Sequence, residues 1–208
     1  VQVNGISNPK RKFENSTQRK RTVILLFIVF FLYSASNDLV IKPFTLYMRV
    51  HRSGLSSQFP EVLYILFTVF GTLGVVMSGR IKSKIGFHRL MAFLYTGQIP
   101  IAIIFIVLDV DNIYVDMVFS ALLGFFYLTV YITIQSELSF FVHFKRLGFG
   151  YASLLSFGWF GAFSFQLLGG FLADKFGVQW YFILSQILAI SVITIVQFIP
   201  KLPPTKPK

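Results

Sequence analysis

The stretch Gly79-Arg80-Ile81-Lys82-Ser83-Lys84-Ile85-Gly86-Phe87-His88-Arg89 separates two apolar runs, which extend from Phe59 to Ser78 and from Leu90 to Leu108. Each run has about 20 residues, the length that an α-helix needs to cross roughly 30 Å of hydrocarbon. The stretch between them carries four Lys/Arg and no acidic residue. Because basic loops of this kind stay on the cytoplasmic side of a membrane, we predict a cytoplasmic loop between two transmembrane helices.

The composition is that of an integral membrane protein. Hydrophobic residues make up 55% of the 208 residues and charged residues only 13%, against roughly a quarter in soluble domains. The formal net charge of +11 would fit a nucleic-acid partner if the basic residues shared one water-exposed face. They are instead spread among separate loops. We therefore predict a lipid bilayer around the chain and no nucleic-acid partner.

The positions of the basic residues predict the topology. Of the 19 Lys/Arg, six lie in residues 10–21, four in residues 80–89, two at positions 145 and 146, and three after Pro200; the other four are Lys42, Arg49, Arg52 and Lys175. These two groups fall in alternate connections between the apolar runs, as the positive-inside rule describes. Both termini are therefore expected to be cytoplasmic.

The expected fold class is all-α, with six transmembrane helices. The predicted helices cover residues 22–41, 60–78, 90–108, 113–138, 148–173 and 178–199. The first should end before Pro43, because proline lacks an N–H and has a fixed φ. The chain then divides into a disordered basic cytoplasmic segment (1–21), a six-helix transmembrane domain (22–199) and a cytoplasmic tail (200–208).

Small residues recur at helical spacing in two of the predicted helices. They are Gly71, Gly74, Ser78 and Gly79 in the second, and Gly158, Gly161 and Ala162 in the fifth. Small side chains let membrane helices approach closely. We therefore expect these positions at contacts between helices.

Nothing in the sequence indicates an enzyme, a cofactor or a metal site. Cysteine is absent, and His51, His88 and His143 lie in three different loops. A catalytic or metal site needs such groups to converge at one depth, so we expect no catalytic residues, metal ligands or cofactor.

Two parts of the chain resemble the major facilitator superfamily of transporters. The opening stretch reads G-x-I-x-x-K-x-G-x-x-R and is similar to the G-x-L-x-D-R-x-G-R-R signature of that family, with Ser83 where the family usually has Asp. Lys145-Arg146, then the stretch Leu167 to Asp174 and then the stretch Phe176 to Phe182, resemble the region from helix 4 to helix 6 of many members. Together these segments extend the resemblance over most of the chain.

A second copy of the loop signature lies elsewhere in the chain. Residues Gly170 to Gly177 read G-F-L-A-D-K-F-G and match the signature better than the opening stretch does. The distribution of charge nevertheless places this copy outside. We keep the assignment that the charge indicates.

The resemblance implies a six-helix half of a twelve-helix secondary active transporter, which moves a small organic solute by alternating access with a coupling ion such as H⁺. The expected partner is a second six-helix half, from the same full-length chain or another copy. Residues 1–21 resemble the loop between halves, which would make this the C-terminal half; an ordinary basic N-terminal tail explains them equally well. The alternative function is a non-transporting membrane protein of the same fold, such as a receptor-like protein or a scaffold.

Polar and aromatic residues inside the predicted helices are the candidates for solute binding. They are Tyr33, Asn37, Asp38, Tyr127, Tyr131, Gln135 and Gln166. Several are four residues apart, so they share a side of their helix. Hydrogen bonding between helices or an interfacial tyrosine belt explains them as well. For Asp38 the alternative is an interfacial ion pair with Lys42.

A second set of residues is expected to form an inside gate. It comprises Gly79, Arg80, Ser83, Lys84, Gly86, Arg89, Glu137 and Arg146. Glu137 could reach Lys145, Arg146 or the loop that begins at Gly79, or it could be a hydrated interfacial carboxylate. Because Ser83 cannot form the charge-assisted hydrogen bonds of an Asp, we expect a weakened latch, and we expect Ser83→Asp to favour the state that is closed on the inside.

Overall fold

The computed structural model describes residues 16–51, 59–108, 113–177 and 179–200, and most of their side chains. Within these residues the chain forms α-helices, one short 3-10 helix (Phe144–Arg146) and no strand. The α-helices are α1 (Ser16–His51), α2 (Phe59–Ile85), α3 (Phe87–Leu108), α4 (Ile113–Phe141), α5 (Leu147–Phe176) and α6 (Gln179–Val196).

Among the described side chains, stretches long and apolar enough to cross a membrane lie in five of these helices: α1, α2, α4, α5 and α6. The described chain is thus that of a multi-pass, all-helical membrane protein. The span predicted on α3 and the sidedness of the termini stay predictions. The acidic turn predicted at residues 109–112 lies outside the described residues.

The first helix is longer at both ends than the sequence predicted. It begins at Ser16 rather than at residue 22, and it continues through Pro43 to His51. The prediction that Pro43 ends the helix is therefore wrong. A proline removes one backbone hydrogen bond, and membrane helices tolerate this where neighbouring groups satisfy the freed carbonyl.

The basic loop predicted after Ser78 is also mostly helical. α2 continues to Ile85, and α3 starts at Phe87, so that Gly86 alone separates the two helices. Gly86 has a φ of 82°, a conformation that only glycine adopts without strain. The loop prediction was wrong because lysine and arginine favour helices, so the helix ends at the glycine and not where the charges begin.

α5 ends in the same way as α2. Gly177 has a φ of 99°, and its N–H donates to the carbonyl of Ala173, as the Gly86 N–H does to the carbonyl of Lys82. We call residues Gly79 to Gly86 the α2 end segment and residues Gly170 to Gly177 the α5 end segment. The similarity of these two stretches in sequence thus corresponds to a similarity in backbone structure.

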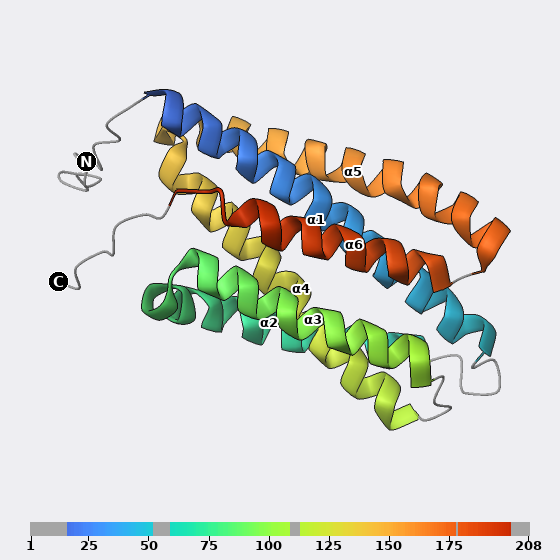
Figure 1. Ribbon diagram of the computed structural model, residues 1–208. Coiled ribbons are helices and arrows are strands. Elements are labelled where there is room, and N and C mark those ends of the chain that lie inside the picture. The colour runs from blue at the N-terminus through green and yellow to red at the C-terminus, as the bar shows by residue number, and fades with distance from the viewer. Residues whose placement is uncertain (1–15, 52–58, 109–112, 178, 201–208) are drawn as a thin grey trace.

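The helices pack as two interleaved groups. α1 packs mainly on α5 and α6, whereas α4 packs mainly on α2 and α3. Figure 1 shows α1, α5 and α6 together along one side, α2 and α3 along the other, and α4 running obliquely between them. Each group therefore combines a helix from one half of the chain with two helices from the other half.

Glycines form the closest contacts in both groups. A side chain at Gly71 or Gly74 of α2 would clash with α4, and one at Gly124 of α4 would clash with the carbonyl of Phe67 on α2. On α5, a side chain at Gly161 would meet the carbonyl of Phe31 on α1. These contacts confirm the predicted close approach.

The remaining small residues divide between contacts and open space. Gly158 of α5 lies against Phe30 and Ser34 of α1, and Ala162 is buried nearby. Gly79 differs, since a side chain there would meet nothing within 4 Å. The expectation that Gly79 lies at a helix contact is wrong, because Gly79 lies on an exposed side of α2, whereas Ser78 beside it is buried.

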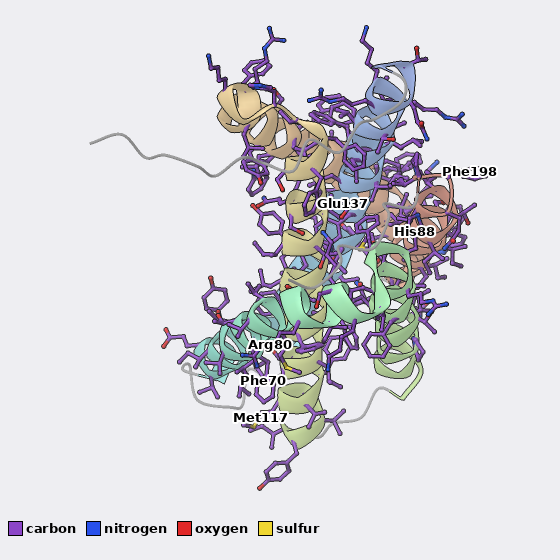
Figure 2. The ribbon with its side chains drawn as sticks, turned by 90° about the vertical axis from the view of Figure 1, so that its left-hand side faces the viewer. Phe70, Arg80, His88, Met117, Glu137 and Phe198 are labelled. Carbon is purple, nitrogen blue, oxygen red and sulfur yellow. The ribbon has the colours of Figure 1, made fainter. Side chains whose placement is uncertain are left out.

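Buried hydroxyl groups join α1 to α6. The Ser36 hydroxyl lies 3.0 Å from the Ser185 carbonyl, and the Ser185 hydroxyl donates to the Ser36 carbonyl at 2.8 Å. At the end of the bundle, a ring nitrogen of His88 lies 2.7 Å from the carbonyl oxygen of Ile199. Figure 2 shows His88 beside Phe198, where the start of α3 meets the residues after α6. Polar contacts therefore reinforce the apolar core on this side.

Most described basic residues gather at one end of the bundle. Figure 1 shows the start of α1, the turn between α2 and α3, the end of α4 and the end of α6 at that end. The basic side chains there are Arg19, Lys20, Arg21, Arg80, Lys82, Lys84, Arg89, Lys145 and Arg146. Lys175 lies at the opposite end, in the α5 end segment. We call the two ends the basic end and the opposite end.

Candidate functional site

A cavity of about 350 Å³ lies between α1, α4 and α5. Its volume falls in the lower part of the range of roughly 300 to 1,000 Å³ that is usual for small-molecule sites. The lining residues are Phe30, Tyr33, Ser34 and Asp38 of α1, Tyr127, Leu128 and Tyr131 of α4, and Leu155, Gly158, Trp159 and Ala162 of α5. Five of these are aromatic and one is acidic. The cavity can therefore surround a small ligand with rings and present one carboxylate to it.

Aromatic contacts hold the wall between α1 and α4 in place. The Tyr33 hydroxyl donates to the backbone carbonyl of Tyr127 at 2.8 Å, and the two rings lie 5.6 Å apart. The ring of Phe30 is 5.7 Å from those of both Tyr33 and Tyr131. Since a buried tyrosine hydroxyl needs a partner, the bond from Tyr33 sets the orientation of this wall.

Four of the seven residues predicted to line a solute cavity lie around this one. They are Tyr33, Asp38, Tyr127 and Tyr131. Asn37, Gln135 and Gln166 do not line it. Asn37 donates to the carbonyl of Tyr33 and accepts a hydrogen bond from Gln98 of α3. Asn37 therefore joins α1 to α3 and does not face the cavity, although it is one turn of the helix after Tyr33.

The contribution of α5 to the cavity was not predicted from the sequence. Gly158 was expected only at a helix contact, and Trp159 was not among the residues predicted to line a cavity. Gly158 lies against Phe30 and Ser34, and the ring of Trp159 completes the α5 wall. The missing information was the position of α5 relative to α4, which no spacing within one helix reveals.

Asp38 lies well inside α1, which continues past it to His51. Its side chain is half-buried and lines the cavity. The side chain of Lys42, its suggested partner, lies outside the described residues. The ion pair between Asp38 and Lys42 therefore stays a prediction.

A second cluster of polar residues lies at the basic end, where α2 crosses α4. The Lys82 ammonium is 2.6 Å from a carboxylate oxygen of Glu137 and donates to the Ser136 hydroxyl at 2.8 Å. The same ammonium lies 5.1 Å from the ring centre of Phe140 and 5.7 Å from that of Phe87. Glu137 therefore reaches the α2 end segment, as one of the alternatives anticipated, and its partner is Lys82, which was not among the predicted gate residues.

Most of the other predicted gate residues point away from this cluster. Arg80, Lys84, Arg89 and Arg146 are exposed. The Ser83 hydroxyl donates to the carbonyl of Arg80 within its own helix. Figure 2 shows Arg80 on α2 and Glu137 on α4, with Met117 toward the other end of α4. Of the predicted gate residues, Glu137 is the buried one that carries charge. The effect predicted for Ser83→Asp stays a prediction.

Comparison with known proteins does not extend these observations. No family model matches the chain, and no curated protein matches it significantly. The class of protein that the structure defines is a multi-pass, all-helical membrane protein with an aromatic cavity.

Proposed function

We propose that the chain is a six-helix half of a secondary active transporter of the major facilitator type, which moves a small organic solute by alternating access. The observation that carries the proposal is the interleaved packing of α1 with α5 and α6 and of α4 with α2 and α3. Each half of a major facilitator transporter is built from two inverted three-helix repeats. If α1–α3 and α4–α6 are two intertwined repeats, the first helix of each repeat should pack on the second and third helices of the other repeat. The observed packing has this pattern.

The two glycine-ended segments support this interpretation. They terminate α2 and α5, the middle helices of the two triplets, and they lie at opposite ends of the bundle (Figure 1). Two repeats of opposite orientation require equivalent segments at opposite ends. The distribution of charge placed the α5 end segment outside, although its sequence resembles a signature expected inside. In this proposal the α5 end segment is the equivalent, in the second repeat, of the α2 end segment in the first.

The cavity supplies the second argument. It is lined by α1, α4 and α5, and solute sites in such transporters lie near the midplane, at the interface of repeats. α2 and α5 also carry many exposed apolar side chains. These include Tyr64, Val69 and Leu73 on α2 and Phe160, Phe163 and Leu167 on α5. A second six-helix half would cover such faces, and lipid would cover what remains. A coupling proton stays part of the proposal without a residue assigned to it.

The test is counterflow of labelled solutes into liposomes that contain the complete gene product. Tyr127→Ala should impair uptake without lowering folded yield, because it removes one wall of the cavity while the backbone carbonyl bonded by Tyr33 remains. The matched control is Tyr114→Ala at the start of α4, where the side chain is 74% exposed and the cavity is distant. If Tyr114→Ala impaired uptake and Tyr127→Ala did not, the cavity would be the wrong site. If folded protein supported no counterflow, a receptor-like or scaffolding role would replace transport.

A further inference from the structure

We propose that the place where α1, α3 and α6 meet binds a small cluster of ordered water molecules inside the bundle. The inference goes beyond the proposed function and does not depend on transport. It rests on buried polar atoms that have no partner in the protein, and on the hydrogen bonds that bring these three helices together.

Two neighbouring residues of α1 define this place. The Ser36 hydroxyl lies 3.0 Å from the Ser185 carbonyl of α6, and Asn37 accepts a hydrogen bond from the Gln98 amide of α3 at 3.2 Å. Because Ser36 and Asn37 are adjacent, the two contacts bring α3 and α6 to the same level of α1. We call the surrounding residues Asn37, Tyr95, Gln98 and Gln186 the polar junction.

Buried polar atoms without a partner gather in the polar junction. Among the described residues, four buried neutral side-chain atoms have no hydrogen-bonding partner in the protein: the Tyr95 hydroxyl oxygen, Gln98 Oε1, and both Nε2 and Oε1 of Gln186. Buried polar groups of folded proteins are nearly always bonded, either to the protein or to ordered water. Since all four atoms belong to the polar junction, they point to one common bound partner.

The orientation of the Gln98 amide is fixed by its neighbours. Asn37 Nδ2 donates to the Tyr33 carbonyl at 2.9 Å, so Asn37 presents its Oδ1 to Gln98. A carboxamide oxygen accepts hydrogen bonds and cannot donate them. Gln98 therefore turns Nε2 toward Asn37 and Oε1 away from it. Rotating the amide by half a turn would set two acceptors against each other, so it would not remove the unpartnered oxygen.

Gln186 reaches the polar junction from α6. It follows Ser185 in the chain and precedes Ala189 by three residues. Ala189 packs in the same apolar cluster as Tyr95 of α3. Positions three apart share a side of a helix, so the Gln186 side chain is on the side of α6 that faces α3. Tyr95 and Gln98 likewise share a side of α3.

Water satisfies this set of groups better than an ion does. The Tyr95 hydroxyl can donate or accept, Gln98 Oε1 accepts, and the Gln186 amide does both. A buried water molecule also donates and accepts, and it typically makes about three hydrogen bonds. All four residues of the polar junction are neutral, so they offer no charge to offset that of a buried ion.

Radiolytic labelling tests for the water directly. A pulse of X-rays splits water into hydroxyl radicals, which oxidise the side chains next to water bound inside a protein. In the complete gene product in detergent, Tyr95 should be oxidised and Met91 should not. Met91 is one turn earlier on α3, is also fully buried, and has the more easily oxidised side chain. Protection of Tyr95 overturns the proposal, and so does oxidation of both residues, which would show that bulk solvent enters.

Thermal unfolding gives an independent test, because bound water reverses the sign of the effect. Removing a buried hydroxyl that has no partner raises stability, whereas removing one that binds water lowers it. Tyr95→Phe should lower the Tm by about 2 to 4 °C. Tyr33→Phe, which removes a hydroxyl bonded to the protein, should lower it similarly, and Tyr64→Phe, at a side chain 71% exposed, should not. An unchanged or higher Tm for Tyr95→Phe refutes the proposal.

A variant on α6 tests whether the helices share the same water. Gln186→Leu should reduce the oxidation of Tyr95, because the water loses the donor and the acceptor that Gln186 supplies. The matched control is Gln197→Leu, at an exposed glutamine just after α6, which should leave the oxidation of Tyr95 unchanged. Oxidation of Tyr95 that does not respond to Gln186→Leu would refute a cluster shared by α3 and α6.

Discussion

The α2 end segment and the α5 end segment begin and end with glycine and stop their helices in similar ways, yet they take part in different contacts. Both end in a glycine with positive φ whose N–H donates to the carbonyl four residues earlier. In the α2 end segment Lys82 forms an ion pair with Glu137 of α4. The equivalent residue of the α5 end segment is Ala173, and the nearby Lys175 lies over the ring of Phe171 in its own helix, 4.4 Å from its centre.

The difference teaches that a glycine turn can end a helix at either end of the bundle. Whether that helix end also contacts a neighbouring helix depends on a single side chain. The glycine turn follows from backbone sterics, which are the same in both places. The link between α2 and α4 depends on a lysine at one position and a glutamate more than 50 residues further along the chain. The basic end is therefore tied across two helices by charge, and the α5 end segment has no ion pair of this kind among the described contacts.

The largest expected effect is on the sidedness of the two segments. The chain contains no cysteine, so Ser83→Cys and Asp174→Cys each introduce a single exposed thiol at equivalent positions of the two segments. A membrane-impermeant maleimide applied to the non-cytoplasmic side should label Asp174→Cys directly and Ser83→Cys only after the membrane is opened, because the basic end is expected to face the cytoplasm. Labelling of both thiols from the same side would break the comparison, since the segments would not lie at opposite ends.

The next largest effect concerns the ion pair that one segment has and the other lacks. Glu137→Gln should lower thermal stability in detergent by about 3 to 5 kcal/mol, because it leaves the Lys82 ammonium against apolar rings without its counter-charge. The control Asp174→Asn should change stability by no more than about 0.5 kcal/mol, as expected for an exposed residue. The double variant Lys82→Met/Glu137→Met should recover much of the loss. Similar losses for Glu137→Gln and Asp174→Asn would show that the ion pair contributes nothing.

A smaller effect should be shared by the two segments. Gly86→Ala and Gly177→Ala each force a side chain onto a backbone with positive φ (82° and 99°), at a cost of about 1 to 3 kcal/mol. The two variants should therefore lose similar stability in the same thermal assay. A loss at one glycine only would mean that the common backbone geometry does not reflect a common structural role.

The smallest effect distinguishes the first glycines of the segments. Gly79→Ala should stabilise the protein by up to about 1 kcal/mol, because alanine favours the helix and no atom lies within 4 Å of the new side chain. Gly170→Ala should gain less, since its side chain would lie 3.3 Å from the Tyr181 hydroxyl. Thermal unfolding of the two variants measures the difference. A loss of stability for Gly79→Ala would indicate a contact at this turn that the isolated chain lacks.

Several features follow from the sequence alone, because each depends on residues close together in the chain. The apolar runs predict the helices, since roughly 20 apolar residues have no other way to satisfy their backbone in a bilayer. The small residues Gly71, Gly74, Gly158 and Gly161 predict close helix contacts, which the structure confirms. Spacing by four places Tyr127 and Tyr131 on the same side of α4, and both line the cavity.

Other features were decided only by the tertiary structure. The sequence does not show that α1 packs with α5 and α6 rather than with α2, that Gly158 and Trp159 complete the cavity, or that Asn37 contacts Gln98 and does not line the cavity. It offered three possible partners for Glu137, and only the crossing of α2 over α4 selects Lys82. The physical reason is that periodicity within a helix specifies which residues share a face, whereas the element that each face meets depends on how all six helices exclude one another from the same space.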